Sequence, residues 1–437
     1  MRLTPTPNGR LRELRESKGL TQAEMASACG VGLRTYQLWE SGRTQTPQER
    51  TLAGLYHLTG KSSPEEVGFH ARPLSPISVP ATGNLVAVTT AALRGHPPAA
   101  VTTMLASGRA ARRIGTTELD RIRTRTHLLS GMYDQWGGGA VTRTALIDTM
   151  RHAARYLSAT YVSDNARSNM WDAVAELSLI VAAMLTDHAD LPTAQTTLLV
   201  GLTAARDAGA HRRALRGRIL AQLVRQTLGR RDLSTALELL DLADSVAESQ
   251  HLPTDVVALF SALRAGATGA LGRLGDTRTL ANRALDLHAS ARRPAVTRGE
   301  VTYEAGFGLA CLELCAGLDV DHATVVLDKA IASFSPSQVR QRTHARTFRL
   351  LTLTERGDAT TALHDVVELR TDVDTLRSAR IRESLALTHL VPRVVRGEPE
   401  AIRVSTALHA YPTPLPTAFL RSRPSPTEVA AALHLAG

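Results

Sequence analysis

Residues 11–50 read LRELRESKGLTQAEMASACGVGLRTYQLWESGRTQTPQER, and this stretch determines the fold of the N-terminal part of the chain. Leu11 opens a stretch with helical spacing of apolar residues, which predicts an amphipathic helix that ends at Gly19. Thr21 followed three residues later by Glu24 is a capping box, in which each side chain bonds the other residue's backbone N–H. A second helix is therefore expected to begin at this point.

A three-residue turn, Gly30–Gly32, separates this second helix from a third one expected at residues 33–39. Two helices joined by a short turn containing glycine have the geometry of a helix-turn-helix. Ala26 is small where the two helices cross, whereas Tyr36 and Trp39 are large enough to fill the space between them. We therefore expect both aromatic side chains to lie in the core and not at the surface.

The outward side of the third helix carries the candidate contacts to double-stranded DNA. A recognition helix inserts its N-terminal end into the major groove, where base edges present distinguishable donors and acceptors. Arg34 could pair bidentately with guanine and Gln37 with adenine, and Leu33 could touch a thymine methyl group. Contacts to phosphates give affinity without sequence choice, and the candidates for them are Thr35, Ser41 and Arg43.

The residues of this motif resemble the lambda-repressor/Cro-like (XRE) helix-turn-helix family. The match lies in Gln22–Ala26, similar to its TQ-x-x-[LVM]-A helix, and in Val31–Arg43, similar to its recognition-helix run. The resemblance implies a small five-helix DNA-binding domain in which Gln22 contacts the DNA backbone and braces the recognition helix. Gly32 departs from the family's usual serine at the recognition-helix N-cap, which removes one hydroxyl that could touch a phosphate.

The net charge of the chain agrees with binding to DNA. The chain has 437 residues and a formal net charge of +10, which is typical of a protein with a polyanionic partner. The first 60 residues hold eight basic and five acidic side chains, so most of the excess charge lies further along the chain. We expect no transmembrane helix and no signal peptide. Together with a count of only three cysteines, this favours the reducing cytosol, and DNA binding would place the protein at the nucleoid.

We expect an all-α protein with three parts. Residues 1–62 form the DNA-binding domain, residues 63–100 are rich in proline and predict an extended linker, and residues 101–437 have helical periodicity almost throughout. Five turns that combine an aspartate with a following alanine recur about 39–44 residues apart, at Asp190, Asp232, Asp276, Asp319 and Asp358. Each aspartate is expected to N-cap a helix. This period favours an α-solenoid of helix pairs over an irregular helical bundle.

The repeats resemble tetratricopeptide repeats in degenerate form, and we describe them as TPR-like. The segment before them resembles the first part of the C-terminal domain of many actinobacterial regulators, with Asp134 and Gly137–Gly139 in the places of the D-x-x-x-GGG pattern. Solenoids of this type present a concave groove for a peptide or a partner helix. The candidate groove residues are the polar ones on the first helices of the pairs, namely Arg218, Gln222, Arg225, Tyr303, Glu304, Arg346 and Arg349.

The sequence favours a DNA-binding transcriptional regulator, and not an enzyme. A single small domain reads only a half-site, so we expect a homodimer with the repeats contributing the interface. No metal, cofactor or membrane partner is expected, and Cys311 and Cys315 are interpreted as core thiols. Two other readings stay open: a protein-interaction scaffold whose DNA-binding module is vestigial, and a plasmid or phage protein acting in replication or transfer.

Overall fold

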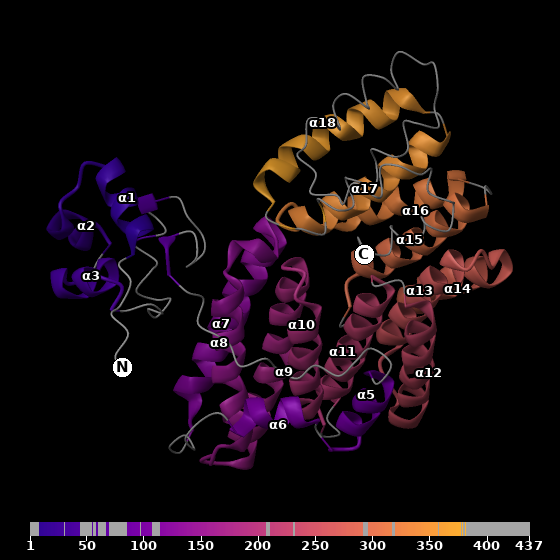
Figure 1. Cartoon of the computed structure of the whole chain (residues 1–437). Coiled ribbons are helices and arrows are strands. Elements are labelled where there is room, and N and C mark those ends of the chain that lie inside the picture. The colour runs from indigo at the N-terminus through magenta and orange to yellow at the C-terminus, as the bar shows by residue number, and fades with distance from the viewer. Residues whose placement is uncertain are drawn as a thin grey trace. The chain divides into compact units, whose positions relative to one another are not determined.

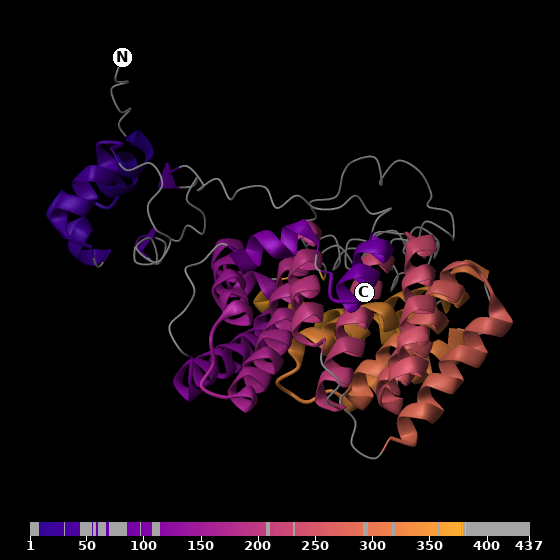
Figure 2. The ribbon, with the colours of Figure 1, turned by 90° about the horizontal axis from the view of Figure 1, so that it is seen from below.

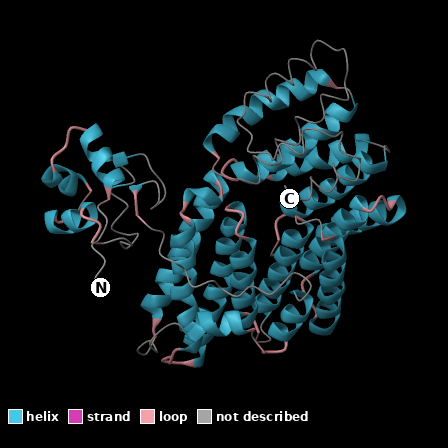
Figure 3. Cartoon of the chain, in the orientation of Figure 1, coloured by secondary structure: helices cyan, strands magenta, loops and turns pink. Residues whose placement is uncertain are grey.

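The computed structural model describes residues 8–29, 31–43, 55, 58–59, 67–69, 85–96, 98–106, 114–206, 210–229, 232–291, 296–316, 320–356, 358–376, 378 and 381. The chain divides into two compact units, Met1–Ser78 and Val79–Gly437. In the described parts the chain is helical without any β-strand (Figure 3), and a single isolated bridge joins Ile114 to Tyr161. The predicted all-α class is confirmed.

The N-terminal unit begins with three short helices, α1 (Gly9–Ser17), α2 (Gln22–Ala28) and α3 (Leu33–Glu40). Leu11, Met25, Tyr36 and Trp39 form its core, and the last two come from the inner face of α3. Burial of the two aromatic rings confirms the expectation drawn from their spacing. The further helices of a five-helix domain fall on residues that lie largely outside the described part of the chain.

The core of this unit extends beyond residue 62, where the sequence suggests its end. Val67 and Phe69 are buried in it, and the ring of Phe69 packs edge-on against Trp39 with centroids 5.6 Å apart. The side chain of Asn8 also donates a hydrogen bond to the carbonyl of Val67 (3.2 Å). A second segment, distant in sequence, therefore closes the core under α3.

The C-terminal unit is a series of helices that pack mostly in pairs (Figure 1). They are α5 (Leu85–Leu93), α6 (Ala99–Ala106), α7 (Thr116–Trp136), α8 (Arg143–Ala154), α9 (Asp164–Asp187), α10 (Leu191–Ala204), α11 (Ala210–Leu228), α12 (Leu233–Gln250), α13 (Thr254–Ala270), α14 (Leu274–Ala289), α15 (Arg298–Ala316), α16 (Val320–Ser333), α17 (Val339–Arg356) and α18 (Ala359–Thr375), with two 3₁₀ turns, Gly138–Ala140 and Arg155–Ser158.

Each helix from α9 onward packs against its sequence neighbour, which gives the pairs α9–α10, α11–α12, α13–α14, α15–α16 and α17–α18. The first helices of successive pairs also contact one another, from α9 through α11, α13 and α15 to α17. In addition α17 packs against α7, so that the last described pair returns to the start of the series (Figures 1 and 2). Residues of α7 therefore lie beside residues of α17, although more than 200 positions separate some of them in the sequence.

Of the four predicted capping aspartates that the structure describes, three cap the second helix of a pair. Asp190, Asp232 and Asp358 each N-cap a helix by accepting a hydrogen bond from the backbone N–H three residues on (3.1–3.3 Å). Asp276 does not cap α14: that helix begins earlier, after Arg273, which leaves Asp276 in its first turn. There a carboxylate still stabilises the helix through its dipole. Asp319 lies outside the described residues.

Part of the segment expected to be an extended linker is helical. Within residues 63–100, α5 packs against α10 and α12, and α6 begins at Ala99. Leu85 and Ala92 on α5 are buried, because the run between the prolines is apolar and of good helix propensity.

One described helix, α9, is long and apolar enough to cross a membrane by length and composition alone. Its most apolar 18-residue window is 72% buried inside the protein. This burial is what a central core helix requires, since its neighbours α7, α8, α10 and α11 pack around it. The length of α9 is therefore explained by its place in the fold.

Candidate nucleic-acid interface

Local hydrogen bonds fix the joint between α2 and α3. The hydroxyl of Thr21 accepts from the N–H of Glu24 (3.2 Å), and the Glu24 carboxylate accepts from the N–H of Thr21 (2.8 Å). This is the predicted capping box, and the bonds that the carboxylate accepts lower the pKa of Glu24. Beyond α2, the N–H of Val31 donates to the carbonyl of Ala26 (3.0 Å), which keeps the turn tight.

The start of α3 is capped without a side chain. Gly32 occupies the N-cap position in an extended conformation and makes no side-chain hydrogen bond. A Cβ at Gly32 would meet only the hydroxyl of Thr35, at 4.0 Å, so the position has room for a serine. Gly30, the other glycine of the predicted turn, lies outside the described residues.

The two faces of α3 differ sharply in exposure. Tyr36 and Trp39 are buried, whereas the opposite face is open to solvent. The apolar side chain of Leu33 is 43% exposed on this face. The exposed residues of this helix are those that the sequence suggests for DNA contact: Leu33, Arg34, Thr35 and Gln37.

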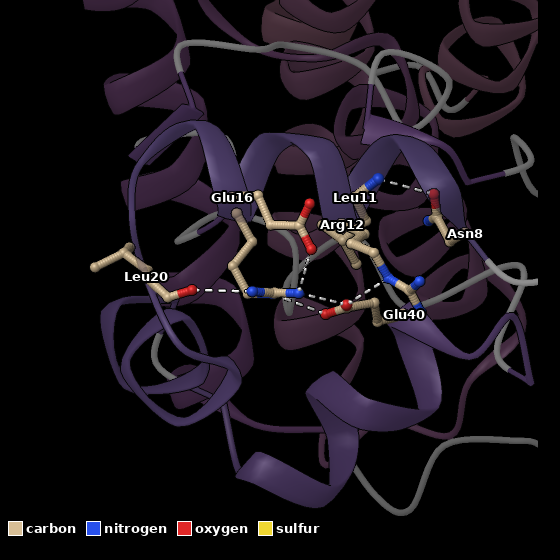
Figure 4. Close-up of polar contacts among 7 residues, drawn as sticks. Asn8, Leu11, Arg12, Glu16, Leu20 and Glu40 are labelled. Carbon is tan, nitrogen blue, oxygen red and sulfur yellow. Dashed lines mark hydrogen bonds and ion pairs between the residues drawn. The ribbon is translucent and has the colours of Figure 1, made fainter.

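An ionic cluster around the buried carboxylate of Glu40 joins the end of α3 to α1 (Figure 4). The carboxylate of Glu40, only 2% exposed, accepts hydrogen bonds from Arg12 Nε (3.2 Å) and from Arg15 Nε (3.1 Å) and Nη2 (2.8 Å). Arg15 also donates to the carbonyl of Leu20 (3.0 Å), so one guanidinium joins both helices to the loop between α1 and α2. These contacts fix the position of the C-terminal end of α3 relative to α1.

The surroundings of Glu40 favour its charged form. The hydrogen bond from Arg15 is the main cause that lowers the pKa of Glu40, with smaller contributions from Arg12 and Gln22, and together they outweigh the opposing effect of burial. The main-chain carbonyl of Glu40 also accepts from the N–H of Asn8 (3.0 Å). Sequence reasoning missed this cluster, although arginines at 12 and 15 share one face of α1 and offered a signal.

The remaining predicted contact residues lie around the two ends of the motif. Gln22, at the start of α2, is half-buried and hydrogen-bonds toward Glu40, which is a bracing contact to α3. Ser41 and Arg43 follow α3 and are exposed, with Gly42 between them in the left-handed region (φ 72°). Ser41 donates its hydroxyl to the carbonyl of Leu38 (3.3 Å). The turn at Gly42 thus carries Arg43 past the helix end.

A scan against protein-family models matches residues 9–67, and the description of the matching family is helix-turn-helix domain. Residues 9–67 form a helix-turn-helix domain. No curated protein and no solved structure matches the chain. The family match covers the described helices α1–α3 and ends at Val67, in the segment that closes the core. Such a domain implies DNA binding, and α3 occupies the place of its second, recognition helix.

In the helix-turn-helix domain the exposed face of α3 offers three kinds of chemistry. Arg34 presents a forked set of donors, Gln37 an amide with both donor and acceptor, and Leu33 a methyl-bearing apolar surface. These groups match the edges of guanine, adenine and thymine in the major groove. Because the buried side of α3 is anchored by Tyr36 and Trp39, the exposed side chains are presented from a rigid support.

The candidate groove residues of the C-terminal unit divide into two groups. Five of the seven line one cavity of about 340 Å³: Arg218, Gln222, Arg225, Tyr303 and Glu304. Arg225 lies between two carboxylates, donating to Glu304 (2.7 Å) and to Glu300 (2.8 Å). These residues come from α11 and α15, first helices of two pairs, as the repeat pattern suggests.

The other two candidate groove residues, Arg346 and Arg349, are not among the residues that line this cavity. Arg346 pairs with Glu368 and Asp372 on α18, both at 3.2 Å. Arg349 pairs with an aspartate on each side, Asp328 of α16 and Asp365 of α18. Both guanidinium groups therefore face the neighbouring helices of the stack, where they join α17 to α16 and α18.

The glycine run after α7 has a structural role. The N–H of Gly138 donates to the buried carboxylate of Asp187 at the end of α9 (2.9 Å). A Cβ at Gly138 would lie 2.5 Å from the main-chain carbonyl of Met184, so a larger residue is excluded there. Asp134, from the same motif, accepts a hydrogen bond from the side chain of Gln341 on α17 (2.5 Å).

The cysteines and metal-ligating residue types offer no second site within the described chain. Cys311 is buried in α15, and the side chain of Cys315 lies outside the described part. Among the residues that the structure describes, no group of three or more His, Cys, Asp and Glu side chains is placed to hold a metal ion.

Proposed function

We propose that this protein is a sequence-specific transcriptional regulator that acts at the nucleoid in the cytoplasm. In this proposal α3 of the helix-turn-helix domain, of the XRE type that its motif resembles, enters the major groove of operator DNA. The observation that carries the proposal is the sorting of α3 into a buried aromatic face and an exposed face made of Leu33, Arg34, Thr35 and Gln37. In the major groove the apolar side chain of Leu33 could contact a thymine methyl group, while Arg34 and Gln37 could hydrogen-bond neighbouring bases.

Phosphate contacts are proposed for the residues around this face. Thr35 and Ser41 carry exposed hydroxyl groups, and Arg43 carries an exposed guanidinium just past the helix end. Gln22 would reach a phosphate from the start of α2 while it braces Glu40. Such contacts orient the domain on the duplex and make its affinity depend on salt.

The C-terminal unit would act as the sensing and dimerising part of the regulator, with no catalytic role. Its helix pairs support a TPR-like description, and its cavity supports an effector site. Two copies are needed because one helix-turn-helix domain reads a half-site, so we propose a homodimer with recognition helices about one DNA turn apart.

Selection of bound duplexes from a random pool, followed by measurement of affinity for the selected and scrambled sequences, tests this function. Replacing both Arg34 and Gln37 with alanine should cost about 2–6 kcal/mol of sequence discrimination, since each bidentate contact carries about 1–3 kcal/mol. Lys18→Ala is the matched control, because Lys18 is an exposed cation at the end of α1. It should alter affinity for both sequences equally. Equal discrimination by the double variant and the wild type would refute the proposal.

A further inference from the structure

The cavity of the C-terminal unit is bordered by the first helices of the series and by α7. It holds about 340 Å³ and is lined from α7, α9, α11, α15 and α17. Because α17 also contacts α7, the cavity is bordered by the first described pairs and by the last one. Its volume is near the lower end of the range for pockets that enclose a single small molecule.

Much of the charge around this cavity is paired within the protein. Arg340 donates to the buried carboxylate of Asp187 (2.7 and 2.9 Å), and its guanidinium lies 4.4 Å from the ring centroid of Tyr133. Arg225 is similarly bracketed by Glu300 and Glu304. These ion pairs fix the positions of the charged side chains and leave the two arginines with counter-charges inside the protein.

One end of the cavity is left with hydrogen-bond acceptors. Asp134 accepts a bond from the amide nitrogen of Gln341 through one oxygen, and the structure describes no donor to its other oxygen. The amide oxygen of Gln341 is buried, also without a donor among the described residues. Burial raises the pKa of Asp134, and the bond from Gln341 and the charge of Arg340 offset only part of that effect. Among the described residues no cationic side chain donates a hydrogen bond to Asp134 or Gln341, because the guanidinium of the nearby Arg340 is bonded to Asp187.

Another part of the cavity, on α11, is left with hydrogen-bond donors. Arg218 makes no hydrogen bond or ion pair with any residue that the structure describes. Its charge acts on Glu300: burial alone would raise the pKa of Glu300, but the charges of Arg225 and Arg218 hold it below its ordinary value. One turn along, Gln222 accepts weakly from Arg225 (3.4 Å) through its oxygen, and its amide nitrogen has no acceptor among the described groups.

Apolar side chains of α9, the helix between α7 and α11, also line the cavity. Leu179, Ile180 and Ala183 of α9 line the cavity, and α9 packs against both α7, which carries Asp134, and α11, which carries Arg218. A molecule that lies along these side chains therefore meets acceptors at one end and donors at the other.

We propose that this cavity binds a small zwitterion of di- or tripeptide size, with its ammonium group at Asp134 and Gln341 and its carboxylate at Arg218 and Gln222. An extended di- or tripeptide is about 7–10 Å long, and apolar side chains would pack on Leu179 and Ile180. The inference deepens the sensing role proposed above, but the binding claim itself does not depend on recognition of DNA.

Thermal unfolding and calorimetric titration of the full-length protein, without DNA, test the proposal. The probes are the free peptides Ala-Ala, Ala-Leu, Leu-Ala, Leu-Leu and Ala-Leu-Ala, each with an N-acetylated and a C-amidated counterpart. We expect free peptides with leucine to bind with a Kd below 1 mM and to raise the Tm. Either blocking group should weaken binding at least tenfold, since each removes one charged end.

Variants assign the two ends. Arg218→Gln should abolish the preference for the free carboxylate over the amide, and Asp134→Asn the preference for the free amine over its acetylated form. Arg283→Gln and Asp286→Asn, exposed on α14, are the matched controls and should change neither preference. The proposal is overturned if no peptide of the panel binds the wild type, or if blocked and free peptides bind it equally.

The effect on DNA is a separate measurement. A bound peptide that leaves affinity for selected duplexes unchanged would remove the link to regulation while leaving the binding site established. Conversely, a protein that binds these peptides but discriminates no DNA sequence would keep the pocket and contradict the proposed regulatory function.

Discussion

Replacing Glu40 with glutamine removes the charge at the centre of the cluster that anchors α3. Glu40 is 2% exposed and Arg15 14% exposed, so the variant would leave a guanidinium nearly buried beside a neutral amide. Breaking a buried ion pair by removal of one partner costs about 3–5 kcal/mol. The pair with Arg12, which is 54% exposed, adds about 0–1 kcal/mol. Since glutamine can still accept one hydrogen bond, we expect a loss of about 3 kcal/mol.

Amide hydrogen exchange measured by mass spectrometry on the full-length protein can read this loss locally. Exchange of the peptides that cover α1 and α3 reports the free energy of opening of this unit, separately from the C-terminal helices. A loss of about 3 kcal/mol corresponds to exchange about a hundredfold faster. Peptides from α13, in the other unit, should exchange as in the wild type.

Glu13→Gln is the matched control, because Glu13 lies exposed on α1. It should leave exchange in α1 and α3 within about twofold of the wild type, as surface substitutions usually change stability by less than about 0.5 kcal/mol. If Glu40→Gln behaved like this control, the cluster would not hold α3 and the reasoning would be refuted.

Three further predictions concern charge, packing and acid. Asp187→Asn leaves Arg340 buried without its counter-charge, so it should lower the free energy of unfolding by about 3–5 kcal/mol. Thermal melts measure this loss. The control Asp148→Asn, at an exposed ion pair, should lower it by less than about 1 kcal/mol. Gly308→Ala places a Cβ 2.7 Å from the backbone of Ala265 and should destabilise by about 1–3 kcal/mol, whereas Gly131→Ala meets no atom within 4 Å and should stabilise α7 by about 0.5–1 kcal/mol. A higher Tm for Gly308→Ala would contradict the close packing of α13 and α15. The lowered pKa of Glu40 means that its charge stabilises the fold above the ordinary carboxyl pKa of 4.5, and that this contribution is lost as the pH falls through the lowered value. The protection of α3 amides, taken relative to the intrinsic exchange rate at each pH, should therefore fall below about pH 4.5 in the wild type and fall less steeply in Glu40→Gln.

Features set by neighbouring residues could be predicted from the sequence. The capping box of Thr21 and Glu24 and the exposed side of α3 follow from spacings of three or four residues, and the structure has both. The pairing of Glu40 with Arg15 could not be read in the same way, because 25 residues separate them and only the crossing of α1 and α3 brings them together.

The same distinction explains the candidate groove. Arg218, Gln222 and Arg225 share one face of α11 by helical spacing, so their common place in the cavity could be anticipated. Arg346 and Arg349 also lie on the first helix of a pair, but they form ion pairs with acidic side chains of α16 and α18. The contact of α17 with α7 brings Gln341 to Asp134, although 207 residues separate them. No pattern of neighbouring residues predicts such a contact.

Genome-wide mapping of bound DNA, for the wild type and for the variant with Arg34 and Gln37 both replaced by alanine, tests the central claim most directly. The account predicts discrete sites that share a two-fold symmetric motif for the wild type, and loss of those sites for the variant at equal protein level. Occupancy of the same sites by the variant would contradict the assignment of α3 as the reading element.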